Sequence, residues 1–235
     1  AAVCAGARAA GGWTAGLGPA AVAAVVALAV LAPVVAHNSA KAGRLVGVSA
    51  NGGLNLYIGQ GQGATGFFRT FAGLNFDADP AGVAFLSSRL GRPVAGPAEA
   101  DRLWLGEALA WVRDHPLASA ALWAKKVWLH FAAWEIDQVT PLAAWQRDVP
   151  LLRALALPYG ALAAAALVGL ALVGGRRPWR PWSAALLLLV AAQSLFFVVT
   201  RYRLVLVPLL CLLAGAAVAE ARARRGRARL ATGGL

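Results

Sequence analysis

Two arginines near the C-terminal end of the sequence could hold a phosphate group. Arg201 and Arg203 belong to the stretch TRYR, which separates two apolar runs. A guanidinium group presents a planar fork of donors that fits the oxygens of a phosphate. The alternative is that both side chains extend to lipid headgroups, as basic side chains do at helix ends. We expect phosphate binding, because arginines are disfavoured on the outer side of a membrane, where the topology below places them.

A glycine-rich stretch, NGGLNLYIGQGQGATG at 51–66, suggests a second kind of chemistry. Its last six residues match the GxGxxG turn of dinucleotide-binding domains. Such a turn requires a strand before it and a long helix after it. The segment 54–58 is predicted to be a strand, but 67–80 allows barely two helical turns before Pro80 breaks the pattern. A nucleotide cofactor is therefore disfavoured, which leaves a flexible loop or the motif of another family.

The composition is that of a membrane protein rather than a soluble one. Of the 235 residues, 60% are hydrophobic and 14% are charged, and the mean hydropathy is +0.64. The net charge of +12 raises the possibility of nucleic-acid binding, but the basic runs lack aromatic stacking platforms. These runs, at 176–180 and 222–229, lie beside apolar runs, as cytoplasmic flanks of transmembrane helices do. We expect membrane lipids as partners and no nucleic acid.

The sequence identifies no cofactor. Cys4 and Cys211 lie far apart, so they predict no disulfide framework. His37 and His115 have no partner at metal-ligand spacing, so no metal site is predicted, although a role for a divalent ion is left open.

Four apolar runs are predicted to cross a bilayer, whose core needs about 20 residues of helix. The basic flanks place both termini inside and TRYR outside. We therefore expect an all-α polytopic membrane protein with about four transmembrane helices and a large extracytoplasmic loop region. The predicted runs are 18–36, 151–174, 183–199 and 204–219, and TRYR is a tight turn between the last two. The predicted divisions are 1–36 (first span and cytoplasmic flank), 37–150 (extracytoplasmic), 151–220 (three spans) and 221–235 (basic cytoplasmic tail).

The outer region contains two predicted helices. The first begins at Pro97 and is stopped by Asp114-His115-Pro116. Its predicted apolar face comprises Leu103, Leu105, Leu109, Ala110, Trp111 and Val112.

The second, at 117–134, carries two adjacent lysines that would cost several kcal/mol at a bilayer centre. It is predicted to lie flat on the outer leaflet, with Lys125 and Lys126 charged at headgroup depth. Trp123, Val127, Phe131 and Trp134 share a stripe, and Lys126 and His130 lie off it.

Four stretches, in order, resemble bacterial family-39-type glycosyltransferases of the GT-C class, which include protein mannosyltransferases and the aminoarabinose transferase of lipid A. The stretch 51–66 resembles the family's exoplasmic loop, NGG-x-N-x-YIGNNP-x-A-x-G, with Gln60-Gly61-Gln62 in place of NNP. The other stretches are 99–116, 125–136 and 200–210, the last with Val205 in place of a proline. The matching residues are Asn51, Gly52, Gly53, Asn55, Tyr57, Ile58, Gly59, Ala64, Gly66, Lys126, Glu135, Arg201, Tyr202, Arg203 and Pro208. The resemblance covers about residues 30–220.

The resemblance implies an enzyme of the bacterial inner membrane that moves a sugar from a polyprenyl-phosphate lipid to an acceptor glycan, lipid or protein outside. The expected donor-phosphate residues are Arg201, Arg203 and Lys126, and the expected substrate pocket contains Asn51, Asn55, Tyr57, Glu135 and Tyr202. The family's acidic base motif has no counterpart here, so we expect a C-terminal fragment that is inactive by itself. The alternative is a non-catalytic scaffold, lipid-binding protein or transporter fragment.

Overall fold

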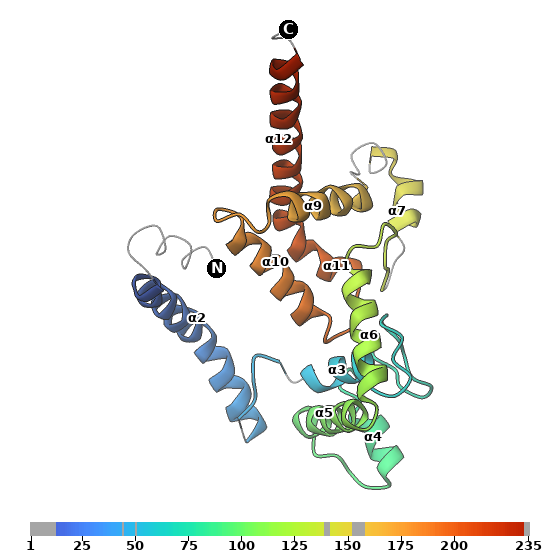
Figure 1. The fold of residues 1–235 in the computed structure, drawn as a ribbon. Coiled ribbons are helices and arrows are strands. Elements are labelled where there is room, and N and C mark those ends of the chain that lie inside the picture. Colours follow the sequence, from blue (N-terminus) through green and yellow to red (C-terminus); the bar gives the residue numbers. More distant parts are fainter. Residues whose placement is uncertain (1–12, 44, 50, 139–141, 152–157, 233–235) are drawn as a thin grey trace.

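The computed structural model describes residues 13–43, 45–49, 51–138, 142–151 and 158–232 (Figure 1). These residues form helices joined by loops and contain no strand beyond a single bridge between Phe67 and Val198. The predicted all-helical class is therefore confirmed for the described chain. The predicted strand at 54–58 is wrong, because that segment lies within α3 (Gly52–Gln60). Its packing between two other parts of the chain outweighs the strand preference of its residue types.

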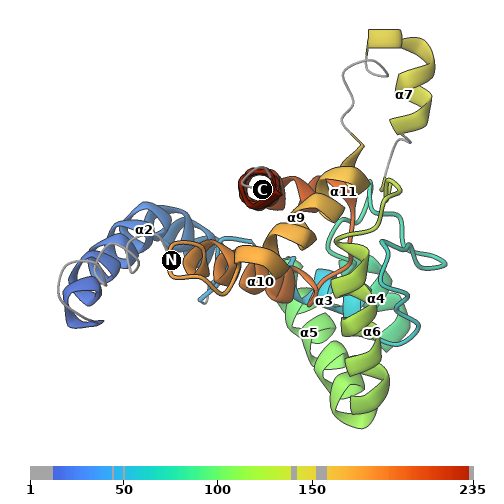
Figure 2. The ribbon, with the colours of Figure 1, turned by 45° about the horizontal axis from the view of Figure 1, so that its top comes forward.

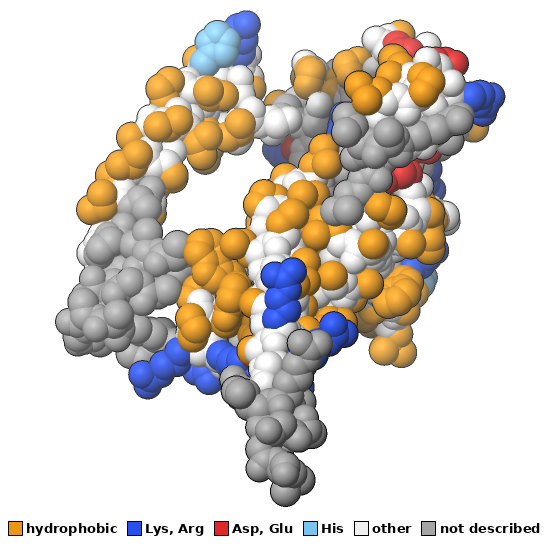
Figure 3. Space-filling view, turned by 90° about the horizontal axis from the view of Figure 1, so that it is seen from above, with side chains coloured by type: hydrophobic (Ala, Val, Ile, Leu, Met, Phe, Trp, Pro, Cys, Tyr) orange, Lys and Arg blue, Asp and Glu red, His pale blue; other side chains and the backbone are white. Residues whose placement is uncertain are grey.

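Two helical stretches of the described chain are long and apolar enough to cross a membrane. They are Ala24–Ala42, in α2 (Trp13–Ala42), and Thr200–Gly226, which leads into α12 (Val207–Thr232). They overlap the predicted spans 18–36 and 204–219. None of the apolar window of α2 is buried, and Figure 3 shows open space between α2 and the rest of the molecule. An apolar helix without protein neighbours is suited to a lipid environment.

The two middle runs form shorter helices than a full span requires. Helix α9 (Tyr159–Val173) has 15 residues and α10 (Arg180–Gln193) has 14. At 1.5 Å per residue they measure about 22 and 21 Å, less than the roughly 30 Å of a bilayer core. The expectation of four full spans is therefore not confirmed. Residues 152–157 of the predicted run 151–174 lie outside the described residues.

The stretch TRYR is not a hairpin turn. It forms α11 (Thr200–Arg203), which continues through a 3₁₀ turn, η1 (Leu204–Leu206), into α12. The chain instead reverses between the end of α10 and α11, over residues 194–199, as Figures 1 and 2 show. The helical hydrogen bonds of TRYR fix its side chains on a rigid element that begins the long C-terminal helix.

Helices α9 and α12 cross at close range, as Figure 1 shows. A Cβ built on Gly169 would lie 1.9 Å from the carbonyl oxygen of Leu213, so only glycine permits this approach. Ala163 and Ala166 are fully buried on the same face of α9. Small residues at such spacing are typical of helix contacts within membranes, where close backbone approach supplies the packing energy.

The part of the chain between α2 and α9 packs α3 against α5. The remaining helices there are α4 (Val83–Leu90), α5 (Pro97–Asp114), α6 (Pro116–Leu129) and α7 (Leu142–Asp148). The predicted bounds of α5 are confirmed, but its predicted face is only partly correct, because Leu103 packs against the core and two other members do not. Leu105 and Leu109 are exposed, whereas Ala100, Trp104 and Ala108 are fully buried toward α3.

The glycines of α3 explain this choice of face. A Cβ on Gly53 would lie 1.9 Å from the carbonyl oxygen of Asp101, and the Gly53 amide donates to the Asp101 carboxylate at 2.6 Å. On the opposite side, a Cβ on Gly59 would lie 2.7 Å from the Cα of Phe196. The glycine-rich stretch is thus neither a phosphate-binding turn nor a flexible loop at these positions. Its glycines allow one helix to contact two backbones.

Candidate functional site

Lys126 joins three segments that are distant in the sequence. Its side chain is completely buried, and its ammonium donates to the carbonyl oxygens of Gly59 at 2.9 Å and Leu195 at 3.3 Å. These bonds link α6 to the end of α3 and to the segment after α10. The ammonium is therefore enclosed by protein and not exposed to lipid headgroups, while its depth in a membrane stays a prediction. Backbone carbonyl groups replace the water that a charged lysine needs.

Arg203 connects the start of the C-terminal helix to the segment after α6. Its guanidinium donates to the carbonyl oxygens of Trp134 and Ala132, both at 2.9 Å, and only 1% of the residue is exposed. It also lies 3.8 Å from the ring centroid of Tyr159, at the start of α9. Its two terminal nitrogens therefore bind protein groups, whereas its Nε has no hydrogen-bond partner in the described part of the chain.

Glu135 and Thr200 form a second link beside Arg203. The Thr200 hydroxyl donates to the Glu135 carboxylate at 2.6 Å. The amide of Ile136 donates to the same hydroxyl oxygen, and the Thr200 amide donates to the Ile136 carbonyl, each at 2.8 Å. Glu135 is half-buried. The carboxylate thus holds the first residue of α11 in place, and it remains partly accessible from outside.

His130 lies within this polar interior, one helical turn after Lys126. It is 1% exposed, and neither ring nitrogen has a hydrogen-bond partner in the described part of the chain. Burial, and then the positive charges of Arg203 and Lys126, lower the pKa of the His130 ring to about 4. Burial likewise lowers the pKa of the Lys126 ammonium to about 7. The imidazole is therefore neutral near neutral pH, because burial disfavours its charged form and the nearby basic groups add to this effect.

Arg201 differs from its neighbour two residues away. Its side chain is exposed, and its guanidinium lies 5.1 Å from the ring centroid of Tyr202 and 3.4 Å from that hydroxyl. Tyr202 is half-buried and packs against Phe197 at 5.6 Å between ring centroids. Of the three expected phosphate-binding cations, Arg201 alone has its side chain on the surface of the protein.

The expected pocket residues of α3 have separate environments. Tyr57 is buried in an aromatic cluster, with ring centroids 4.8 Å from Trp104 and 5.5 Å from Phe71. Asn55 is half-buried, and Asn51 is exposed at the start of the helix. Tyr57 and Tyr202 both contact the hydrophobic core that includes Phe197. The structure therefore places α3 and TRYR on one core, with Asn51 at its edge.

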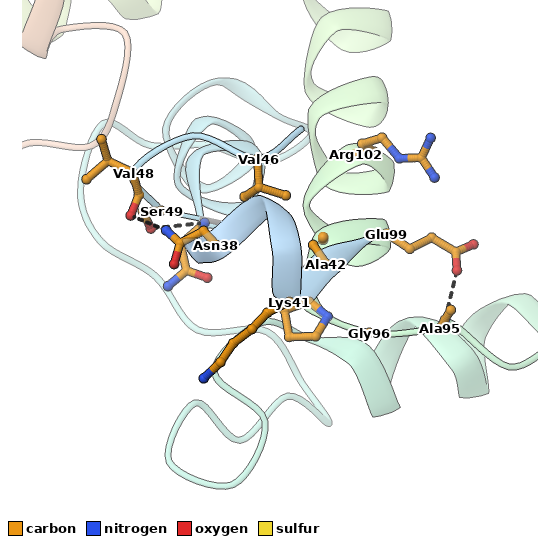
Figure 4. A pocket seen from close by; sticks show the side chains of 13 residues that line it. Asn38, Lys41, Ala42, Val46, Val48, Ser49, Ala95, Gly96, Glu99 and Arg102 are labelled. Atoms are coloured by element: carbon orange, nitrogen blue, oxygen red, sulfur yellow. Dashed lines mark hydrogen bonds between the residues drawn. The ribbon is translucent and has the colours of Figure 1, made fainter. Parts of the chain in front are cut away.

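A cavity of about 700 Å³ lies beside Asn51, between the end of α2, residues 45–49 and the start of α5. Figure 4 shows that its two cations, Lys41 and Arg102, point away from one another. Glu99 bonds to the amide of Ala95 at the rim. In a binding site, a few polar side chains point toward the same position. The charged side chains of this cavity do not, so we place the candidate site at Arg201 and Glu135 instead.

Three contributors to this region were not identified as site residues from the sequence. Tyr159 lies within an apolar run, Thr200 precedes Arg201, and Asp101 lies in the acidic start of the helix that begins at Pro97. Tyr159 donates to the His130 carbonyl at 2.7 Å, which ties α9 to the end of α6. Only the adjacency of Thr200 to the two arginines could have drawn attention to it.

The described residues contain no group of three His, Cys, Asp or Glu side chains that could hold a metal ion. Comparisons of the chain with models of protein families, with curated proteins and with solved structures gave no match.

Proposed function

We propose that this chain acts in a glycosyltransferase of the bacterial inner membrane, which moves a sugar from a polyprenyl-phosphate lipid to an acceptor outside the cell membrane. One observation carries the proposal. The four stretches that resemble the GT-C family contact one another through buried or partly buried hydrogen bonds, although they are spread over residues 51–210.

The membrane placement follows from the two ends of the C-terminal helix. From Arg201 to Arg222 the chain rises about 30 Å, at 1.5 Å per residue, which equals the thickness of a bilayer core. We therefore assign residues 37–150 and TRYR to the outer side and the arginines after Glu220 to the cytoplasmic side. In this arrangement α9 and α10 are embedded beside α12 as short helices, and the protein is multi-pass.

Arg201 is the residue proposed to contact the donor phosphate. In the transfer, an acceptor hydroxyl oxygen attacks the sugar's anomeric carbon and loses its proton to a base, while the bond to the phosphate oxygen breaks and the polyprenyl phosphate departs with the electron pair. A forked donor at that phosphate stabilises the charge that develops on it. Lys126 and Arg203 hold the surrounding backbone and add long-range positive potential. We assign no base among the described residues.

Lipid binding by the purified chain in nanodiscs tests this proposal. We expect polyprenyl phosphate to bind more tightly than the uncharged polyprenol. Arg201→Ala should weaken binding of the phosphate by about 10- to 150-fold, because a charge-assisted bond contributes roughly 1.5–3 kcal/mol. Arg201→Lys should restore only part of it, since the fork is lost.

Arg113→Ala is the matched control, because Arg113 is also exposed and lies on α5 away from TRYR. It should leave binding unchanged. Equal affinity for phosphate and alcohol, or equal losses in the two variants, would favour the non-catalytic scaffold.

A further inference from the structure

Two arginine-rich segments from different parts of the sequence meet at one end of the molecule. Arg176, in the turn between α9 and α10, forms two hydrogen bonds with Glu220 of α12, at 2.8 and 3.1 Å. Arg224 binds the same carboxylate at 3.1 Å from the next turn of α12. Glu220 thereby fixes the turn beside the helix, so that the two basic runs form one surface.

We call this surface the basic pole. Six arginines and one glutamate give it a net charge of five positive, and all six arginines are exposed. Figure 3 shows basic side chains around this end of α12 and the neighbouring turn. Arg177, Arg222 and Arg225 have no acidic partner in the described part of the chain, so their charge is uncompensated. The pole comprises Arg176, Arg177, Arg180, Glu220, Arg222, Arg224 and Arg225.

The surroundings of the basic pole indicate what it binds. Exposed apolar side chains of α9 and α12, including Val168 and Val218, continue up to the arginines. Trp182 is partly exposed within the first turn of α10, beside Arg180. Tryptophan at the boundary between an apolar band and a basic cluster is typical of the membrane interface. Surfaces that bind nucleic acid lack such an adjoining apolar band.

We propose that the basic pole is a binding site for anionic lipid headgroups of the leaflet in which α9 and α12 end. Guanidinium groups that lie at headgroup depth bind phosphate oxygens as forked donors, and the net positive charge selects anionic over zwitterionic lipids. The inference depends on membrane embedding of α12 and is independent of the proposed sugar transfer.

The test measures binding of a fluorescent phosphatidylglycerol to the full chain in a neutral detergent, with a fluorescent phosphatidylcholine as reference. The variant carries Arg177→Gln, Arg222→Gln and Arg225→Gln. Each arginine near a membrane surface is worth about fivefold in affinity, so the triple variant should bind phosphatidylglycerol roughly 100-fold more weakly. Binding should also weaken as salt is added.

The matched control carries Arg102→Gln, Arg113→Gln and Arg147→Gln, which removes the same charge from exposed positions of α5 and α7. It should bind phosphatidylglycerol like the wild type. A second variant with lysine at the three pole positions should keep most of the affinity, because it keeps the charge. Equal loss in the two glutamine variants, or no preference of the wild type for phosphatidylglycerol, would overturn the proposal.

Competition assigns the partner. A short DNA duplex at matched ionic strength should displace the lipid no better than sodium chloride does, and inorganic phosphate should behave in the same way. Displacement by DNA at concentrations below those of the lipid would identify a nucleic-acid surface and contradict the lipid assignment.

Discussion

The interior beneath TRYR and the basic pole contain the same kinds of side chain in opposite roles. Lys126 and Arg203 are buried, and their donors bind backbone carbonyl groups. Arg177, Arg222 and Arg225 are exposed, with no acid beside them in the described chain. A buried cation must replace its water with protein acceptors, so it fixes the fold, whereas an exposed cation remains available for another molecule. The role of a basic residue here depends on the carbonyl groups around it.

The largest effect is expected from Arg203→Ala. Removing the guanidinium leaves the buried carbonyl groups of Ala132 and Trp134 without their donor. Each unsatisfied buried group costs about 1–3 kcal/mol, so the free energy of unfolding should fall by about 2–6 kcal/mol. Unfolding in mixed micelles of increasing SDS content measures this. Arg201→Ala is the control and should change stability little; a larger loss from Arg201→Ala would reverse the assigned roles.

The pH dependence of stability tests whether His130 is buried between Lys126 and Arg203. Its pKa is about 4 in the folded protein, against an ordinary value of 6.5. Between these values only the unfolded state binds the proton, so the free energy of unfolding should rise with pH across this window and be level above it. The rise should reach up to about 3 kcal/mol.

Because carboxylates titrate in part of the same window, the measurement is the difference between the wild type and His130→Gln. The variant should lack the rise that belongs to the imidazole. Parallel curves for the two proteins would mean that the ring is accessible to water and not held between Lys126 and Arg203.

Gly53→Ala examines the packing that brings α3 to the buried cations. A Cβ there would lie 1.9 Å from the Asp101 carbonyl oxygen, and the helices must separate to admit it. The loss of stability should be about 1–3 kcal/mol. Gly106→Ala is the matched control on α5, where no atom lies within 4 Å of the new Cβ. It should stabilise by up to about 1 kcal/mol, and a loss at Gly106 equal to that at Gly53 would contradict the close contact.

The smallest effect is expected at the basic pole. Arg222→Ala should change the free energy of unfolding by less than about 0.5 kcal/mol, because exposed side chains without partners contribute little to folding. The same SDS titration measures it. A loss comparable to that of Arg203→Ala would show that the arginine supports the fold and is not available for lipid.

Prediction from the sequence was most successful where a signal is local. The bounds of α5 follow from Pro97 at its start and His115-Pro116 at its end, and the helical class follows from the long apolar runs. The predicted face of α5 was correct at Leu103 and wrong at Leu105 and Leu109, which no neighbour covers in the described part of the chain. The buried face is instead set by Gly53 of α3, which is 51 residues before Trp104 and admits the close approach.

At the candidate site, too, the sequence indicated what depends on local residue types and missed what depends on tertiary contacts. The residue types at TRYR indicated phosphate chemistry, and the family resemblance with its transferase activity stays a prediction. Local spacing could not separate Arg201 from Arg203, because both lie in one helical turn. The segment after α6 meets that turn on one side only, so Arg203 is buried and Arg201 is exposed.

The sequence by itself determined the two apolar helices that are long enough to span a membrane, the two basic runs and the ends of α5, because these depend on the composition of neighbouring residues and on proline. Only the tertiary structure decided which cations are buried, which face of each helix packs, and that Arg176 meets Glu220 across 44 residues of chain. Those outcomes depend on backbone carbonyl groups and glycines of distant segments. Every residue has a backbone carbonyl group, so the sequence does not indicate which carbonyl groups accept hydrogen bonds from a buried charge. The fold decides this by placing particular carbonyl groups next to the charge.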